Sequence, residues 1–163
     1  MRAKEYCCCF TGHRVISQEH IDVLNQNITD IINSLADDGV TDFITGGALG
    51  FDTLAAQKVL EIRIKNPAIR LILALPCKNQ TRNWNKTDVA KYNRIMEEAD
   101  EIIYVSEEYF AGCMHKRNRF MVDNSANCVF YLTSTRGGTA YTVKYALGIE
   151  TNMINAITKQ GMA

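Results

Sequence analysis

The stretch Phe43-Ile-Thr-Gly-Gly-Ala-Leu-Gly-Phe-Asp-Thr53 joins an apolar run to the start of a helical pattern through a pair of glycines. Gly46 and Gly47 permit backbone angles and close approaches that a Cβ would prevent. The first turn of the following helix offers unpaired N–H groups and the positive end of its dipole. The stretch therefore predicts a strand, a tight loop and a helix N-terminus that binds an anion. A plain turn is the alternative interpretation.

Length and composition indicate one globular domain covering residues 1–163. The chain is 47% hydrophobic and 22% charged, which is enough apolar material for a sizeable core. It holds 18 Lys and Arg residues against 18 Asp and Glu residues, so the formal net charge is zero. No global field attracts the protein to nucleic acid or to an anionic membrane, and we expect neither as a partner.

The apolar segments and the cysteines indicate a reducing compartment. No apolar run approaches the roughly 20 residues of a membrane span, and the first six residues are too polar for a signal peptide. We therefore expect a cytoplasmic protein. Cys7, Cys8 and Cys9 are adjacent within an apolar strand pattern, which favours buried, reduced thiols over a disulfide framework. Neither C-x-x-C nor H-x-x-x-H spacing occurs, so we expect no metal site.

Strand and helix patterns alternate along the whole chain. The predicted strands are 6–10, 40–45, 70–75, 102–105, 128–132 and 153–157, and the predicted helices are 18–38, 51–62, 89–99, 114–123 and 140–147. We expect Ser17 to cap the first helix and Gly39 to end it. The pattern predicts an α/β fold of the three-layer, Rossmann-like, doubly wound type. Its sheet should be mainly parallel, with five to six strands and helices on both faces.

The informative loops all follow predicted strands. In open parallel sheets, ligands bind beyond the carboxyl ends of the strands. The loops at Gly12, Gly46, Gly112 and Gly137 should therefore lie on one rim. The order of Gly46, Gly47 and Gly50 does not match the dinucleotide fingerprint, and no G-x-x-x-x-G-K-[ST] loop is present. A nicotinamide-dependent dehydrogenase and an ordinary ATPase are therefore disfavoured.

Four segments together resemble the SLOG superfamily of Rossmann-like proteins. They are Thr11-Gly-His-Arg14, Gly46-Gly-Ala-Leu-Gly-Phe-Asp52, Met114-His-Lys-Arg-Asn-Arg-Phe-Met121 and Gly137-Gly-Thr139. The superfamily includes the LOG cytokinin-activating phosphoribohydrolases, the DNA-processing protein DprA and small YpsA-like proteins. The resemblance covers almost the whole chain and is greatest to the YpsA-like single-domain branch. It implies a nucleotide-binding domain and, because superfamily members self-associate, a homodimer.

The LOG motifs are only partly matched. Met114, His115 and Arg117 fit the Met-His-x-Arg-Lys motif, whereas Asn118 does not. In the second motif, Pro-Gly-Gly-x-Gly-Thr-x-x-Glu, Arg136 and Ala140 replace the proline and the third glycine. Lys144 stands in place of the glutamate. A carboxylate would stabilise the positive charge that builds on ribose as a base leaves, and a lysine would oppose it. LOG-type hydrolysis therefore does not follow from the resemblance.

Other residues could supply the missing carboxylate and hold the ligand. Asp52 is the preferred acid, first as an acceptor for a ribose hydroxyl and then as a catalytic group, and Glu107 and Glu108 are further candidates. The alternative for Asp52 is a favourable charge at a helix N-terminus. Arg117 is the preferred phosphate ligand, because a guanidinium grips phosphate with two parallel hydrogen bonds. Arg119 lies two positions away and should face elsewhere.

The residues expected to bind the ligand are Gly12, His13, Arg14, Gly46, Gly47, Gly50, Asp52, Arg117, Asn118, Gly137, Gly138 and Thr139. The main hypothesis is binding or sensing of a nucleotide or a nucleotide-derived metabolite, such as a nucleoside phosphate or an ADP-ribose-like molecule. No cofactor is required for this. The alternative is an N-glycosidase or transferase acting on nucleoside phosphates, so whether the protein is an enzyme stays open. A DprA-like role in binding single-stranded DNA is disfavoured by the zero net charge.

Overall fold

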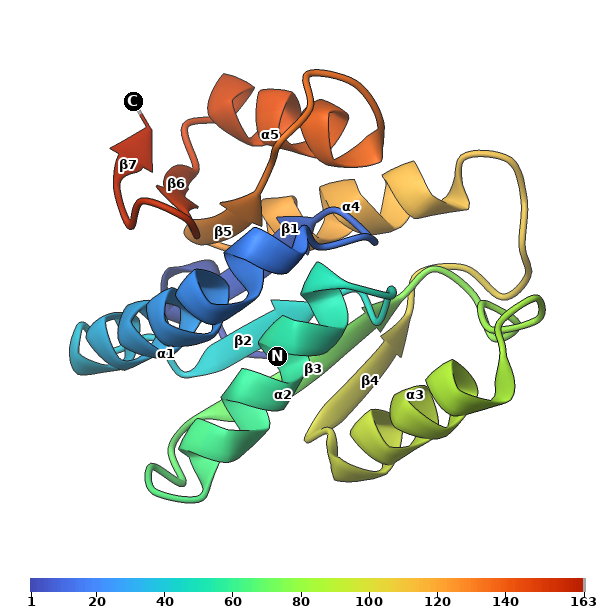
Figure 1. Cartoon of the computed structure of the whole chain (residues 1–163), viewed down its shortest axis with the longest axis horizontal. Coiled ribbons are helices and arrows are strands. Elements are labelled where there is room, and N and C mark those ends of the chain that lie inside the picture. Colours follow the sequence, from blue (N-terminus) through green and yellow to red (C-terminus); the bar gives the residue numbers. More distant parts are fainter. Residues whose placement is uncertain (163) are drawn as a thin grey trace.

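The computed structural model describes residues 1–162 and contains one seven-stranded sheet with five α-helices in that range (Figure 1). The strands are β1 (Cys7–Gly12), β2 (Asp42–Thr45), β3 (Arg70–Leu75), β4 (Glu101–Tyr104), β5 (Asn127–Tyr131), β6 (Asn152–Asn155) and β7 (Gly161–Met162). The helices are α1 (Ile21–Asp37), α2 (Phe51–Arg63), α3 (Lys86–Glu98), α4 (Cys113–Asp123) and α5 (Gly138–Gly148). Short 3₁₀ turns precede β1 and α1 at Lys4–Tyr6 and Gln18–His20.

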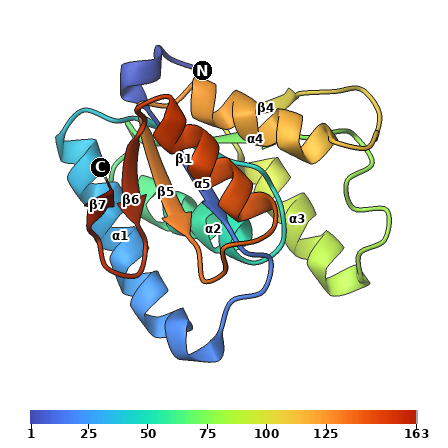
Figure 2. The same ribbon diagram turned by 90° about the horizontal axis from the view of Figure 1, so that it is seen from above.

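The strand order is β4-β3-β2-β1-β5-β6-β7, and every pairing is parallel except that of β6 with β7. The predicted three-layer, mainly parallel α/β fold is therefore confirmed. Figure 2 shows β5, β6 and β7 side by side at the end of the sheet where the described chain ends. β7 was not expected, because a two-residue strand carries no detectable alternation of apolar and polar residues.

Alternate residues of the strands supply two cores. Phe10, Phe43 and Leu73 pack on the side covered by α1, α2 and α3. Cys9, Ile44 and Cys128 pack on the side covered by α4 and α5. Figure 1 shows the sheet between these two groups of helices. A strand covered on both faces is apolar at successive positions, which is why β1 and β3 read as continuous apolar runs.

Two expected helix boundaries were wrong. Ser17 precedes the 3₁₀ turn rather than α1, and its hydroxyl contacts Glu19 at 3.1 Å instead of capping a helix N–H. The residue before α1 is His20, which makes no side-chain cap. α3 begins at Lys86, three residues before its predicted start at residue 89, because Asn85 caps it through the N–H of Asp88 at 2.9 Å.

All six cysteines are free and buried, as expected for reduced thiols. Burial raises the pKa of Cys7 to about 11, with the nearby Asp42 carboxylate adding to the effect. Among residues 1–162, none of the helices combines the length and apolarity that a bilayer crossing requires.

Candidate functional site

A cavity of about 300 Å³, called the β1 cavity below, lies at the carboxyl end of β1, bordered by the first turns of α2 and α5 and by one face of α4. The chain leaves β1 toward the α1 face and leaves β5 toward the α5 face, so this is the position where the winding of the sheet reverses. The residues that line the cavity are Thr11, Gly12, His13, Arg14, Ala48, Asp52, Met114, Arg117, Asn118, Met121, Gly138 and Thr139.

The structure brings most of the predicted ligand-binding residues to this cavity. Those that line it are Gly12, His13, Arg14, Asp52, Arg117, Asn118, Gly138 and Thr139. Sequence reasoning missed Thr11, Ala48, Met114 and Met121. Met121 lies two turns of α4 after Met114, so helical spacing carried a signal that could have placed both on the face of Arg117.

Arg117 is a buried side chain that ties α4 to the end of β2. Only 4% of the residue is exposed, and its Nη1 donates a hydrogen bond to the carbonyl of Gly46. Its Nε donates to Oδ1 of Asn118 at 2.7 Å. A Cβ at position 46 would overlap the guanidinium and lie 2.7 Å from Oδ2 of Asp52. Glycine is therefore required at position 46 for the arginine to reach the loop.

Asp52 faces Arg117 inside the same cavity. It is 5% exposed, its Oδ2 lies 3.9 Å from Nη1 of Arg117, and it accepts a hydrogen bond from the N–H of Ala48 at 3.3 Å. Burial raises the pKa of Asp52, because the loss of hydration outweighs the attraction of Arg117. Burial also lowers the pKa of Arg117, although a guanidinium remains protonated in proteins.

The glycine loop between β2 and α2 is covered rather than open. The N–H of Phe51, at the start of α2, donates to the carbonyl of His13 at 3.1 Å. A Cβ at Gly50 would lie 2.7 Å from that same oxygen. Gly47 and Gly50 have φ values of 64° and 74°, the left-handed conformations that glycine adopts without strain. Gly46, Gly47 and Gly50 thus shape the loop but do not line the cavity.

The N-terminus of α5 is the helix end that opens into the cavity. Gly138 and Thr139 line it, and Gly137, with φ 95°, precedes them. No side chain caps this end. Within residues 1–162, the N–H groups of Gly138 and Thr139 have no hydrogen-bond acceptor outside the helix. Such N–H groups and the helix dipole favour an anion, so the helix end suited to an anion in this cavity is that of α5, whereas the sequence had indicated α2.

The β1 loop contributes one fixed ring and one unpaired cation. Nε2 of His13 accepts a hydrogen bond from the N–H of Thr133 at 2.9 Å, and the ring packs edge-on against Tyr131. Arg14 is exposed, and its guanidinium makes no hydrogen bond or ion pair with any residue from 1 to 162. Arg14, Arg117 and Asp52 together carry one positive charge, which favours an anionic ligand.

The remaining charged candidates lie elsewhere. Glu107 forms an ion pair with Lys78 at 2.7 Å and lines, with Glu108, a separate surface depression. Lys144, at the LOG glutamate position, is exposed and does not line the cavity. Arg119 lies over the rings of Tyr141 and Tyr145, at 5.5 and 5.3 Å, away from Arg117, as its position had predicted. Among residues 1–162, Asp52 is therefore the only carboxylate that lines the cavity.

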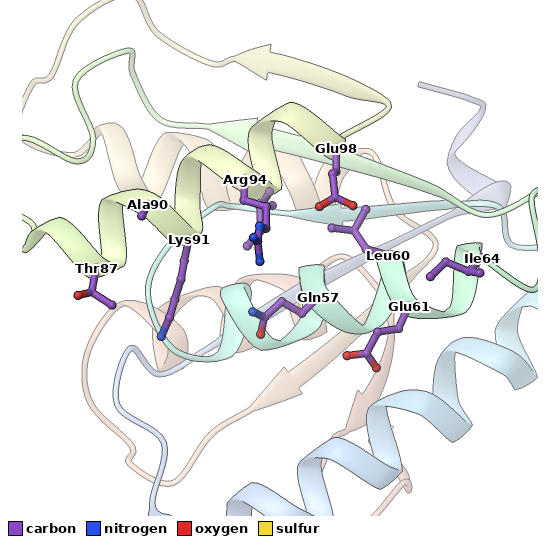
Figure 3. Close-up of a pocket in the computed structure, with 10 residues that line it drawn as sticks. Gln57, Leu60, Glu61, Ile64, Thr87, Ala90, Lys91, Arg94 and Glu98 are labelled. Carbon is purple, nitrogen blue, oxygen red and sulfur yellow. The ribbon is translucent and has the colours of Figure 1, made fainter.

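A larger hollow of about 590 Å³ separates α2 from α3 and holds none of the predicted site residues. Figure 3 shows Lys91 and Arg94 reaching from α3 toward Gln57 and Leu60 of α2. This hollow lacks the convergent N–H donors of the β1 cavity. Among residues 1–162, no three His, Cys, Asp or Glu side chains gather as metal ligands would.

Comparisons with known proteins identify relatives in sequence and in fold. The profile of the YspA SLOG family matches residues 8–160. The SPbeta prophage-derived protein YoqJ of Bacillus subtilis is 36% identical over 116 residues, which cover 64% of this chain and 68% of YoqJ. The UPF0398 protein SERP1017 of Staphylococcus epidermidis is 30% identical over 104 residues, covering 63% of this chain but only 55% of that protein.

A solved structure with the same fold is DNA processing protein A of Helicobacter pylori, described for its single-stranded DNA binding mode. It superposes with a TM-score of 0.66 at 18% identity, covering 93% of this chain and 65% of that one. At this identity the likeness shows the fold alone.

Proposed function

The chain belongs to the YspA SLOG family, and from this premise we propose that it binds a nucleotide or a nucleotide-derived metabolite in the β1 cavity. The observation that best supports this proposal is that unpaired hydrogen-bond donors converge on the cavity. The open N-terminus of α5 and the unpaired Arg14 line it, and Asp52, the only acid that lines it among residues 1–162, already accepts a hydrogen bond within the protein.

The cavity suits a phosphorylated sugar. The N–H groups of Gly138 and Thr139 and the guanidinium of Arg14 are donors for phosphate oxygens. Asp52 is an acceptor for a sugar hydroxyl. Nη2 of Arg117, whose contact within the chain is the soft sulfur of Met114 at 3.9 Å, retains a donor for the ligand. A volume of about 300 Å³ is at the lower end of the range of roughly 300–1,000 Å³ for small-molecule sites.

The test is thermal unfolding with ribose 5-phosphate, AMP and ADP-ribose. A compound present at about 100 times its dissociation constant should stabilise the fold by about 2.7 kcal/mol. Arg14→Ala should weaken binding, whereas Arg82→Ala removes another exposed arginine that lines a different depression and should leave binding unchanged. Absence of a shift with all three compounds would reject the proposal.

A second function is favoured by one observation, the position of Asp52 inside the cavity with a raised pKa. A carboxylate beside the sugar could stabilise positive charge on ribose while the glycosidic bond to a base breaks and water adds. An N-glycosidase would release free base from AMP. Chromatography of the reaction should then show adenine with the natural chain and none with Asp52→Asn. Binding of AMP without release of adenine would reject the N-glycosidase and leave binding as the only function.

A further inference from the structure

A chain of hydrogen bonds joins α4 to α5 beside the β1 cavity. Nε of Arg117 donates to Oδ1 of Asn118 at 2.7 Å, and Nδ2 of Asn118 donates to the hydroxyl of Thr142 at 2.8 Å. That hydroxyl in turn donates to the carbonyl of Gly138 at 2.8 Å. From these bonds, and on the basis of the proposed function, we infer that Asn118 and Thr142 are positioning residues. They hold the first turn of α5 in place against Arg117.

The direction of each bond in this chain is fixed by its members. A guanidinium can only donate, so the amide of Asn118 turns its oxygen toward Arg117 and its NH₂ group toward Thr142. The Thr142 hydroxyl accepts from that NH₂ group and gives its own hydrogen to the Gly138 carbonyl. Arg117 and Thr142 are 4% and 1% exposed, so water competes little for these groups. A change at Thr142 should therefore alter the surroundings of Arg117, although the two are joined only through Asn118.

The two ends of the chain are the parts of the cavity that offer donors to an anion. At one end, Nη2 of Arg117 has the Met114 sulfur as its contact within residues 1–162. At the other end are the N–H groups of Gly138 and Thr139, which start α5. α4 and α5 lie side by side on one face of the sheet (Figure 1). A phosphate that accepts from both helices needs them at a fixed spacing, and donors held in place beforehand bind more tightly.

Asn118 thus has a different role from the ligand contact that the sequence predicted. It lines the cavity, but its Oδ1 and its Nδ2 each have a partner within the protein. An aspartate at this position would accept from Arg117 but could not donate to Thr142. A lysine would offer no acceptor to Arg117 and would add a second cation beside it. Asparagine is therefore suited to this position because one short side chain both accepts and donates.

The first experiment examines the chain of bonds without a ligand, through the Arg117 Nε–H signal in ¹⁵N NMR spectra. Thr142→Val replaces the hydroxyl by a methyl group and should move this signal, whereas Thr142→Ser keeps the hydroxyl and should restore it. Thr151→Val is the matched control, because Thr151 is also buried and its hydroxyl makes no hydrogen bond with residues 1–162. An Arg117 signal that is the same in Thr142→Val as in the natural chain would overturn the inference.

The second experiment measures the affinity for ribose 5-phosphate by isothermal titration calorimetry. Asn118→Ala and Thr142→Val should each weaken binding about three- to tenfold, as expected for the loss of one hydrogen bond. The double variant should lose little more than the weaker-binding single variant, because both changes interrupt the same chain of bonds. Thr142→Ser and Thr151→Val should bind within about twofold of the natural chain.

The outcomes separate this inference from the proposed function. Unchanged affinity in Asn118→Ala and Thr142→Val would overturn the positioning role, even with a moved NMR signal, and would leave the proposed function standing. Losses that simply add in the double variant would also overturn it, since the two residues would then act independently. Failure of ribose 5-phosphate, AMP and ADP-ribose to bind the natural chain would reject the proposed function and this inference with it.

Discussion

At the level of single residues, the site depends on the absence of one carbon atom at position 46. The guanidinium of Arg117 occupies the space where a Cβ would stand and bonds the Gly46 carbonyl. Sequence reasoning selected both residues but assigned them separate roles, glycine for an anion and arginine for a phosphate. The two residues that make this contact lie far apart in the chain, and the local periodicity of a sequence does not predict contacts of that kind.

We predict that Gly46→Ala destabilises the protein by about 1–3 kcal/mol, the usual cost of inserting a methyl group into a packed site. The buried guanidinium has to move, and Asp52 loses its nearest cation. Gly148→Ala is the control. Nothing lies within 4 Å of the new methyl, and alanine in α5 should add up to about 1 kcal/mol. The urea midpoints of the two variants, compared at constant m-value, measure both changes in stability. Equal midpoints for Gly46→Ala and Gly148→Ala would contradict the contact between Arg117 and Gly46.

Asp52 should make the protein less stable at neutral than at acid pH, relative to Asp52→Asn. Its pKa is raised on folding from an ordinary value of 3.8. The folded state thus holds the proton more strongly, and this stability is present below that value and disappears as pH rises through the folded pKa. Unfolding free energies from pH 3.5 to 7.5 should show the natural chain losing stability against the variant. A growing advantage for the natural chain would mean that Arg117 outweighs burial.

At the level of elements, the order of strands and helices was readable because each element has a long or strongly apolar pattern. The errors fall at ends. Asn85 and Asp88 precede residue 89, where the helix was predicted to begin. Asn85 nevertheless accepts from the N–H of Asp88 at 2.9 Å, and its amide donates to the Asp88 carboxylate at 2.7 Å. Gly137 and Gly138 were predicted to bind the ligand, but the open helix end was expected at α2 and not at α5. That α2 is covered by His13 depends on tertiary packing, which spacing does not encode.

The Asn85 cap should contribute to the stability of α3. Asn85→Ala removes the acceptor for the Asp88 N–H and is expected to cost about 0.5–2 kcal/mol. Asn93→Ala, at an exposed position within the same helix, should be neutral or slightly stabilising because alanine has the higher helix propensity. Denaturation curves for the two variants give the comparison. A larger loss from the Asn93 change would show that the cap is not the important contact.

At the level of the whole molecule, the six thiols report how completely the two cores are closed. All are buried. Burial holds the pKa of Cys8 well above the ordinary thiol range, and a hydrogen bond with Cys9, together with burial, does the same for the pKa of Cys128. Thiolate is the reactive form, so a colourimetric disulfide reagent at pH 8 should react with fewer than about one thiol in the folded protein. All six should react in denaturant. Rapid reaction of several thiols before unfolding would show that a core opens locally.

The central place of β1 in the sheet has a consequence during synthesis. β1 leaves the ribosome before the other strands, yet one of its two neighbours is β5, where Cys8 pairs with Asn127. At about 5–20 residues per second, the nascent chain waits on the order of ten seconds for that partner. Until β5 is made, β2 is the one strand available to pair with β1, and the other side of β1 stays an unpaired, strongly apolar edge. The nascent chain is therefore exposed to mispairing with another unfinished chain at the strand that later lies in the middle of the sheet.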